Sequence, residues 1–427
     1  MDKIIIKPKV LKGNIVVPPS KSLGHRGIIA TALSRGISRV DNIQLSKDIE
    51  ATMEIMKELG AVVNIEGHSL HIDGRKMFSY EKKLDLRCKE SGSTLRFLIP
   101  LALTKEGDYI FHGEGKLISR PLEPYYEIFE EKGIKYSTED GGLPLKVRGK
   151  LTSGTYRVRG DISSQFITGL LFSLPILDGN SKIEITTKLE SEGYIDLTLD
   201  ILKDFGIEIE NNNYKEFNIR GAQKYNSRNY YVEGDYSQGA FFLVAGALGS
   251  SIVCSGLNKN SLQGDKVILD ILEAMGCSME ESEEGIKVKP SRTKGIEIDA
   301  SNCPDLVPVL TALASLSEGE TRIVNAKRLR IKECDRLHAI TKELNKLGAN
   351  IIELEDSLII SGVNELKGGE VDSHNDHRIV MALAIAATRA KGNVIINNPM
   401  AIEKSYPNFF KDYFKLGGEC DEFNYRE

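Results

Sequence analysis

The sequence has no tryptophan, few cysteines and no long apolar run. Its six cysteines contain no C-x-x-C pair, so neither a disulfide framework nor a regularly spaced zinc site is indicated, and we expect reduced thiols. The longest apolar stretches, IVMALAIAAT and FFLVAGALG, are well short of the ~20 residues that span a bilayer. We expect both to form buried core helices.

An excess of charge of one sign is also missing. The formal net charge is -5, with 27% charged residues, so nothing global favours nucleic acid or an anionic membrane as a partner. The N-terminal segment MDKIIIKPKV has an acidic second residue and no apolar stretch followed by a small-residue cleavage site, which argues against a secretory signal. We therefore expect a cytoplasmic protein whose anion sites are built from local basic residues.

What the sequence does have is a long internal repeat. A helix-like run ends in glycine, and a short polar hairpin follows, in IMKELGAVV, IFEEKGIKY, ILKDFGIEI, ILEAMGCSM, ELNKLGANI and YFKLGGEC. The stop glycines are Gly60, Gly133, Gly206, Gly276, Gly348 and Gly417. They are 73, 73, 70, 72 and 69 residues apart, whereas short solenoid repeats have units of ~20 to 50 residues. The unit is therefore a whole supersecondary block, copied six times.

Each block has the same predicted order of elements: strand, helix, strand, helix, strand, strand. The first helix is apolar on all sides and so is expected to be buried, while the second is the glycine-terminated one. The 427 residues divide into two groups of three blocks. We expect one domain at residues 14–234 and a discontinuous one at 1–13 with 235–427, because the strand KIIIKP stands outside the first block and is expected to pair with the last.

Nearly all unusual polar clusters fall just before a helix or on its first turn. They are Lys21, Ser22 and Arg26; residues 91–96; Arg120; Ser163, Ser164 and Gln165; Ser191 and Tyr194; Asp305; Lys332, Glu333 and Arg336; His377 and Arg378; and Lys404. A helix N-terminus presents unpaired N–H groups and partial positive charge, which bind anions. Lysine and arginine are disfavoured there unless an anion is present, so their concentration predicts a cleft for phosphate and carboxylate groups.

Other interpretations of single motifs were weighed. A serine or aspartate before a helix is more often a plain cap. PPSKS lacks the glycine that a nucleotide-binding loop has before its lysine. His374, Asp376 and His377 resemble metal ligands, but no further cluster of His or Cys stands at ligand spacing. We therefore expect no metal and no cofactor.

Seven motifs in order carry a family resemblance. They are PPSKSLGHRG, ESGSTLRF, SRPLEP, DISSQF, IKECDRL, NDHR and EKSYPNF. Together they resemble the 3-phosphoshikimate 1-carboxyvinyltransferases, the 5-enolpyruvylshikimate-3-phosphate synthases of aromatic amino acid biosynthesis, from about residue 8 to about residue 415. The resemblance implies an α/β (α+β) fold, a two-domain inside-out α/β barrel of six βαβαββ repeats, with the active site in the interdomain cleft.

The resemblance also implies a reaction and its residues. The enolpyruvyl group of phosphoenolpyruvate is transferred to the 5-hydroxyl of shikimate 3-phosphate, with release of phosphate, through a tetrahedral intermediate; a monomer is expected. The implied catalytic residues are Asp305 as base, with Glu333 and Lys21 as proton carriers. The shikimate 3-phosphate ligands are Lys21, Ser22, Arg26, Ser163, Ser164, Gln165, Ser191, Tyr194, Asp305, Arg328 and Lys332. The phosphoenolpyruvate ligands are Lys21, Gly92, Arg120, Gln165, Arg336, His377, Arg378 and Lys404.

Some positions depart from the family pattern. Glu90 stands where asparagine is usual. An acidic residue there is expected to change the affinity for phosphoenolpyruvate and for the herbicide glyphosate, which competes with it. Arg328 replaces an asparagine near the shikimate phosphate, and Glu192 and Gly193 replace a Lys-Pro pair.

Three rival functions were considered. UDP-N-acetylglucosamine 1-carboxyvinyltransferases share the fold, but they usually carry a reactive cysteine at the position of Gly115 and a Lys-Asn pair where this chain has Lys21 and Ser22. A non-catalytic binding protein would not need Asp305, Lys21 and Glu333 together. A related RNA-processing enzyme would need a basic tract or stacking platform.

Overall fold

Two compact units make up the chain in the computed structural model, which describes residues 2–80 and 83–421. One unit comprises Met1–Pro18 and Gly234–Glu427, and the other Pro19–Glu233. The boundary expected after residue 13 is wrong, because it cuts strand β2 (Lys12–Val16), which pairs in parallel with β15 (Ser251–Ser255) in the first unit. The chain therefore stays in that unit up to Pro18.

Six four-stranded sheets share one pairing pattern, in which a parallel pair is followed by two antiparallel pairs. In the sheet β6-β7-β9-β8, β6 and β7 are parallel, and β9 pairs antiparallel with both β7 and β8. Parallel neighbours need a crossover, which a helix supplies, whereas antiparallel neighbours can be joined by a hairpin. The predicted order of strand, helix, strand, helix and hairpin is thus the order that this sheet requires.

The unit Pro19–Glu233 contains the sheets β14-β3-β5-β4, β6-β7-β9-β8 and β10-β11-β13-β12. Their strands are β14 (Tyr230–Tyr231), β3 (Ile37–Asp41), β4 (Val62–Glu66), β5 (Ser69–Asp73), β6 (Lys83–Arg87), β7 (Gly107–His112), β8 (Lys135–Glu139), β9 (Gly142–Gly149), β10 (Thr155–Val158), β11 (Ser181–Ile185), β12 (Ile209–Asn212) and β13 (Glu216–Ile219). Their helices are α1 (Lys21–Leu33), α2 (Lys47–Glu58), α3 (Gly92–Ala102), α4 (Glu123–Lys132), α5 (Ser164–Ser173) and α6 (Glu192–Asp204).

The other unit contains the sheets β16-β17-β15-β2, β18-β19-β21-β20 and β22-β23-β1-β24. Its remaining strands are β1 (Lys3–Lys7), β16 (Met279–Ser282), β17 (Gly285–Val288), β18 (Glu297–Asp299), β19 (Glu320–Val324), β20 (Asn350–Glu353), β21 (Leu358–Ser361), β22 (Gly369–Asp372), β23 (Val394–Asn397) and β24 (Glu419–Asp421). Its helices are α7 (Tyr236–Ala247), α8 (Ile268–Ala274), α9 (Val307–Ala314), α10 (Arg336–Lys346), α11 (His377–Ala387) and α12 (Phe409–Lys415). Strand β1, the KIIIKP segment, pairs with β23 and β24 of the last repeat.

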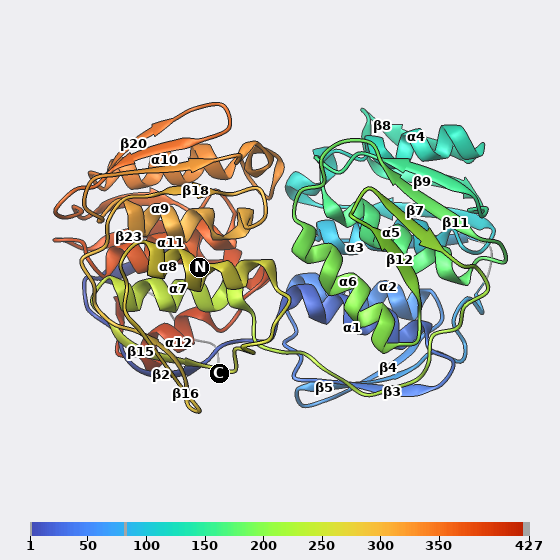
Figure 1. Ribbon diagram of the computed structural model, residues 1–427, viewed down its shortest axis with the longest axis horizontal. Coiled ribbons are helices and arrows are strands. Elements are labelled where there is room, and N and C mark those ends of the chain that lie inside the picture. Colours follow the sequence, from blue (N-terminus) through green and yellow to red (C-terminus); the bar gives the residue numbers. More distant parts are fainter. Residues whose placement is uncertain (1, 81–82, 422–427) are drawn as a thin grey trace. The chain divides into compact units, whose positions relative to one another are not determined.

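Helices fill the inside of each unit and sheets lie outside them (Figure 1). Every residue of α7 and α11 is buried, as an all-apolar helix must be. A buried serine or aspartate caps four of the first helices, α1, α3, α7 and α11; Ser91, for example, accepts a hydrogen bond from the Thr94 amide at 3.2 Å. Each unit has its own hydrophobic core.

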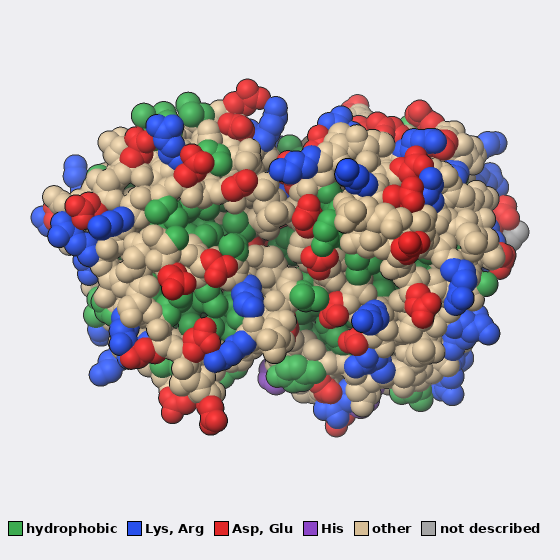
Figure 2. Space-filling view, in the orientation of Figure 1, with side chains coloured by type: hydrophobic (Ala, Val, Ile, Leu, Met, Phe, Trp, Pro, Cys, Tyr) green, Lys and Arg blue, Asp and Glu red, His purple; other side chains and the backbone are tan. Residues whose placement is uncertain are grey.

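The six stop glycines have positive φ, between 67° at Gly133 and 106° at Gly60. Residues with side chains rarely adopt this conformation, so glycine ends each second helix and turns the chain into the hairpin. Acidic and basic side chains are interspersed on the visible face of each unit (Figure 2). Within the described residues, the search for a helix long and apolar enough to cross a membrane found none.

Candidate active site

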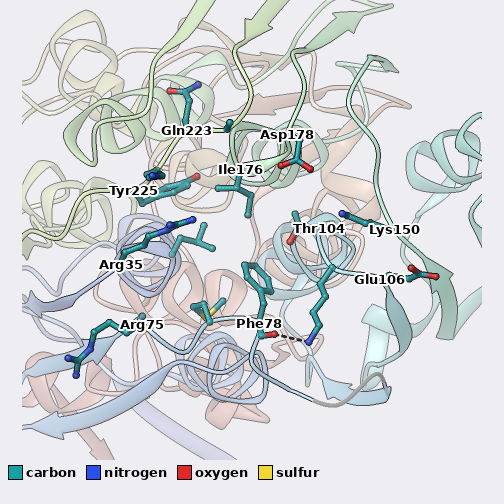
Figure 3. Close-up of a pocket in the computed structure, with 16 residues that line it drawn as sticks. Arg35, Arg75, Phe78, Thr104, Glu106, Lys150, Ile176, Asp178, Gln223 and Tyr225 are labelled. Carbon is teal, nitrogen blue, oxygen red and sulfur yellow. Dashed lines mark hydrogen bonds between the residues drawn. The ribbon is translucent and has the colours of Figure 1, made fainter.

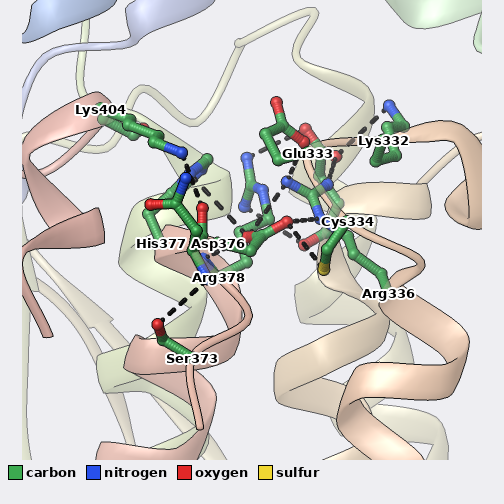
Figure 4. A network of polar contacts seen from close by, with 12 residues as sticks. Lys332, Glu333, Cys334, Arg336, Ser373, Asp376, His377, Arg378 and Lys404 are labelled. Atoms are coloured by element: carbon green, nitrogen blue, oxygen red, sulfur yellow. Dashed lines mark hydrogen bonds and ion pairs between the residues drawn. The ribbon is translucent and has the colours of Figure 1, made fainter. Parts of the chain in front are cut away.

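A buried arginine with three carboxylate partners lies at the centre of the site in the first unit (Figure 4). Arg336 begins α10, and its Nε donates to Oδ2 of Asp376 at 2.7 Å. Its Nη1 donates to Oδ1 of Asp305 at 2.8 Å, and its Nη2 to Oε2 of Glu333 at 2.6 Å. Burial disfavours the charge, but these carboxylates outweigh it and hold the pKa of Arg336 well above its ordinary value.

Asp305 is the second centre of this cluster. Its Oδ2 accepts from Nη2 of Arg378 at 2.9 Å, and its Oδ1 lies 3.6 Å from Nζ of Lys332. Burial raises the pKa of the Asp305 carboxyl, but Arg378, Lys332 and Arg336 together hold it well below its usual value. Asp305 is therefore an ionised carboxylate near neutral pH.

The pKa of Lys332 is also shifted, in the direction that favours its neutral form. Burial, reinforced by Arg336 and Arg328, lowers its pKa to about 8, although Asp305 opposes the shift. The Lys332 ammonium is therefore close to its titration point at neutral and mildly alkaline pH.

The other predicted residues of this unit lie on neighbouring segments. Lys404 closes a short 3-10 helix (Pro399–Lys404), and its Nζ donates to the Asn375 carbonyl at 2.7 Å. Arg328 donates to the Ser301 carbonyl at 2.7 Å. His377 is buried on the first turn of α11.

In the second unit, Lys21 lies at the first position of α1. Its Nζ donates to Oδ2 of Asp48 at 2.7 Å, and both side chains are mostly buried. Asp48 lies in the first turn of α2. No sequence pattern distinguishes Asp48, because an acidic residue in a first turn is common for helix stability alone.

A chain of buried hydroxyls lies beside this pair. Nδ1 of His25 lies 2.7 Å from Oγ1 of Thr52, which lies 2.7 Å from Oγ1 of Thr94, and Thr94 donates to Oγ of Ser91 at 2.7 Å. Burial, then the charges of Lys21 and Arg26, lowers the pKa of His25 well below its ordinary value, so this imidazole is neutral. The chain connects the N-terminal turns of α1, α2 and α3 without adding charge.

The start of α3 also meets α5. Arg96 donates to Oε1 of Gln165 at 2.9 Å, and Nε2 of Gln165 donates to Oγ of Ser93 at 2.9 Å. Arg120 approaches Gly92 so closely that an added Cβ there would lie 2.7 Å from its Nη1. Gly92, Arg120 and Gln165, all predicted phosphoenolpyruvate ligands, thus lie around one helix start.

Arg26 is one of the predicted shikimate 3-phosphate ligands of this unit. Arg26 is buried, and its guanidinium donates to Oγ1 of Thr198 at 2.9 Å and to the carbonyls of Ser22 at 2.8 Å and Tyr194 at 3.0 Å. Burial lowers the pKa of Arg26 to about 10. Through these hydrogen bonds Arg26 connects α1 to α6.

Serines mark the two helix starts nearby. Ser163 caps α5 and Ser164 is its first residue. Ser191 precedes α6 with φ of 59°, and Tyr194 lies in the first turn. These side chains and Ser22 remain predicted ligands.

The metal interpretation of the SHNDHR motif has no support in the geometry. His374 lies 2.9 Å from Glu343, while Asp376 caps α11 and binds Arg336. Across residues 2–80 and 83–421, no group of three or more His, Cys, Asp and Glu side chains is placed to hold a metal ion.

Comparison with known proteins decides the family. The family profile described as EPSP synthase (3-phosphoshikimate 1-carboxyvinyltransferase) matches residues 5–413. The chain belongs to the EPSP synthase family. The resemblance seen in the motifs is therefore confirmed.

Relatives match over nearly their whole length. A protein named 3-phosphoshikimate 1-carboxyvinyltransferase from Clostridium novyi is 55% identical over 433 residues, covering 99% of each chain. One of the same name from Clostridium perfringens is 56% identical over 419 residues, covering 98% of this chain and 99% of the relative. An EPSP synthase structure from Acinetobacter baumannii has a TM-score of 0.81 at 25% identity and covers 99% of this chain and 100% of that one. The predicted α/β fold is confirmed.

Glu90, which departs from the family pattern, lies close to Gly115. Gly115 has φ of 55°, and an added Cβ there would lie 2.7 Å from Oε2 of Glu90. Any side chain at residue 115 would therefore require the Glu90 carboxylate to move.

Replacing Arg336 by methionine is expected to destabilise the protein strongly. The substitution leaves Asp376, Asp305 and Glu333 close together without their shared cation, and breaking a buried pair typically costs about 3–5 kcal/mol. Protonation relieves the repulsion, so the loss in melting temperature should be smaller at pH 5 than at pH 8. The matched control is Arg322→Met, which breaks the exposed pair with Glu320 and should change the melting temperature little at either pH. Equal losses for the two variants would contradict the central role of Arg336.

Proposed function

We propose that this protein transfers the enolpyruvyl group of phosphoenolpyruvate to the 5-hydroxyl of shikimate 3-phosphate and releases phosphate. The observation that carries the proposal is the match to relatives of that name across almost the whole chain. The chemistry of the site agrees with it, because both substrates are polyanions and the basic side chains gather at helix starts. UDP-N-acetylglucosamine as acceptor is the less favoured alternative.

The proposed binding groups divide by charge and position. We assign the phosphoenolpyruvate carboxylate and phosphate to the arginine and lysine donors Arg120, Arg336, Arg378, Lys404 and Lys21, with Gly92, Gln165 and His377 beside them. Shikimate 3-phosphate is assigned to Ser22, Arg26, Ser163, Ser164, Gln165, Ser191, Tyr194, Asp305, Arg328, Lys332 and Lys21. That both units hold one pair of substrates in an interdomain cleft is part of this proposal.

Asp305 is the proposed base for the 5-hydroxyl. A carboxylate held ionised by Arg336, Arg378 and Lys332 can accept a proton, but its low pKa makes it a weak base in the free protein. The anionic substrates add negative charge next to these cations. We therefore infer that substrate binding raises the pKa of Asp305 toward the range in which a base is effective.

The addition forms a bond from the 5-oxygen to C2 of phosphoenolpyruvate, while an acid protonates C3. The product is a tetrahedral ketal phosphate, which then loses a proton from the new methyl group and expels phosphate. Glu333 and Lys21 are the proposed proton carriers. Each already has an ionic partner, Arg336 at 2.6 Å and Asp48 at 2.7 Å respectively, that orients its side chain.

We also propose that the protein works as a cytoplasmic monomer without a cofactor. Sedimentation of the purified chain across a range of concentrations tests the monomer. A mass of two chains at all concentrations would contradict it.

The proposed activity predicts phosphate release that requires two substrates. Purified protein should release phosphate when shikimate 3-phosphate and phosphoenolpyruvate are both present, and should release little with either one alone. A colorimetric phosphate assay measures this directly. Release only when UDP-N-acetylglucosamine replaces shikimate 3-phosphate would show that the assignment is wrong.

Asp305→Asn is expected to lower kcat by ~100-fold or more while KM stays the same or falls. The amide cannot take the 5-hydroxyl proton, but it keeps the shape of the side chain and leaves the neighbouring cations available for the substrates. Steady-state kinetics with both substrates separates the two parameters. An unchanged kcat would remove Asp305 from the role of base.

Activity should also depend on the Lys332 ammonium. Because its pKa is about 8 in the free protein, the fraction that carries charge falls as pH rises through that value. The kcat/KM for shikimate 3-phosphate should therefore decrease by roughly tenfold per pH unit well above pH 8. In Lys332→Arg the charge persists, so this alkaline decrease should move to higher pH. The same profile in both proteins would contradict the assignment.

A further inference from the structure

A second pocket lies in the unit Pro19–Glu233, at the C-terminal ends of its three first helices. It has a volume of about 800 Å³. Leu33 ends α1, Thr104 follows α3, and Ile176 lies in the 3-10 turn (Leu174–Ile176) after α5. The predicted substrate ligands are at the opposite ends of these helices. Since α1 has 13 residues, the separation is about 20 Å at ~1.5 Å per residue.

Each of the three repeats contributes a second segment to the pocket, directly after its hairpin. In each repeat this segment donates a backbone hydrogen bond to a carbonyl just beyond the first helix. The bonds run from Gly74 to Gly36 at 3.0 Å, from Leu151 to Leu103 at 2.7 Å and from Ala222 to Leu177 at 2.6 Å. The pocket is therefore formed by equivalent positions of all three repeats.

The pocket lining carries more positive than negative charge. Five basic residues line it, with Glu106 and Asp178 as the acidic ones. Two of the five are engaged: Arg75 pairs with Asp73 at 2.6 Å, and Lys105 donates to the Phe78 carbonyl at 2.7 Å.

The other three basic residues, Arg35, Lys150 and Lys224, are exposed and have no hydrogen-bond or ion-pair partner among residues 2–80 and 83–421. Cations near helix C-termini often only complement the helix dipole. Here, however, the carbonyls beyond the helix ends already accept hydrogen bonds from backbone N–H groups. The charged groups of these three side chains therefore remain available to a ligand.

The centre of the pocket is apolar. Figure 3 shows Phe78 and Ile176 between Arg35 and Lys150, whose charged ends reach inward from opposite sides. The ring of Tyr225 also lines the pocket, and its hydroxyl donates to the Phe172 carbonyl at 2.8 Å. Phe78 has φ of 64°, which is unusual for a bulky residue and is typical of positions where the surroundings constrain the chain.

We propose that this pocket binds a small organic anion. Its apolar ring would lie on Phe78 and Ile176, and its phosphate or carboxylate would be bound by Arg35, Lys150 and Lys224. A volume of about 800 Å³ is in the ordinary range for small-molecule sites. The proposal does not depend on the enzymatic activity proposed above.

The test compares phenyl phosphate binding to three full-length proteins by isothermal titration calorimetry. The pocket variant is Arg35→Gln/Lys150→Gln/Lys224→Gln. The control is Lys215→Gln/Lys294→Gln/Lys342→Gln, which removes the same charge from exposed lysines elsewhere. Phenyl phosphate can also reach the anion sites at the helix starts, but these are unchanged in both variants. The pocket variant should bind roughly tenfold more weakly than the wild type, and the control should match the wild type.

Inorganic phosphate and Ile176→Ser test the apolar part. Wild-type protein should bind phenyl phosphate more tightly than inorganic phosphate, and Ile176→Ser should reduce this preference. Equal affinities for phenyl phosphate in all three proteins would overturn the proposal. Equal losses of both probes in the pocket variant would overturn it too, because a bare phosphate site needs no apolar centre.

Discussion

The buried guanidinium of Arg336 is the interaction on which the first unit's site depends. It binds three carboxylates: Asp305 before α9 and Asp376 at the start of α11, which are distant in the chain, and Glu333, three residues before it. A cation at a helix N-terminus opposes the helix dipole, so α10 and α11 can begin with Arg336 and with His377 and Arg378 only if anions stand beside them. The carboxylates supply this compensation in the protein alone.

In the second unit, the polar groups at the helix starts are compensated with fewer charged side chains. Lys21 has one carboxylate partner, Asp48, and the neighbouring helix starts are joined by the hydroxyls of Thr52, Thr94 and Ser91 and by a neutral His25. Hydroxyl groups can both donate and accept, so they satisfy buried polar groups without an ionic cost. One unit therefore contains a dense ionic cluster, and the other contains a buried network of hydroxyl groups beside the Lys21–Asp48 pair.

This difference bears on the proposed chemistry. In the first unit, Arg336, Arg378 and Lys332, which we assign to substrate binding, also hold the Asp305 carboxyl ionised, so binding and proton transfer are coupled through the same side chains. In our proposals, both ends of the first helices of the second unit have a binding role. Their N-terminal turns carry the substrate ligands, and their C-terminal ends line the pocket proposed for an organic anion. The fold produces both because all three helices run in the same direction.

The repeat, the stop glycines, the apolar first helices and the residues gathered at helix starts can be predicted from the sequence, because these signals are local. Family membership also followed from short motifs. The pairing of side chains could not be predicted and is visible only in the folded chain: Arg336 with Asp376, Lys21 with Asp48, and Glu90 against Gly115. The pairing of β14 with β3 and the hydrogen bonds by which Arg26 connects α1 to α6 also appear only in the folded protein. These partners lie far apart in the chain, and the packing of separate repeats brings them together.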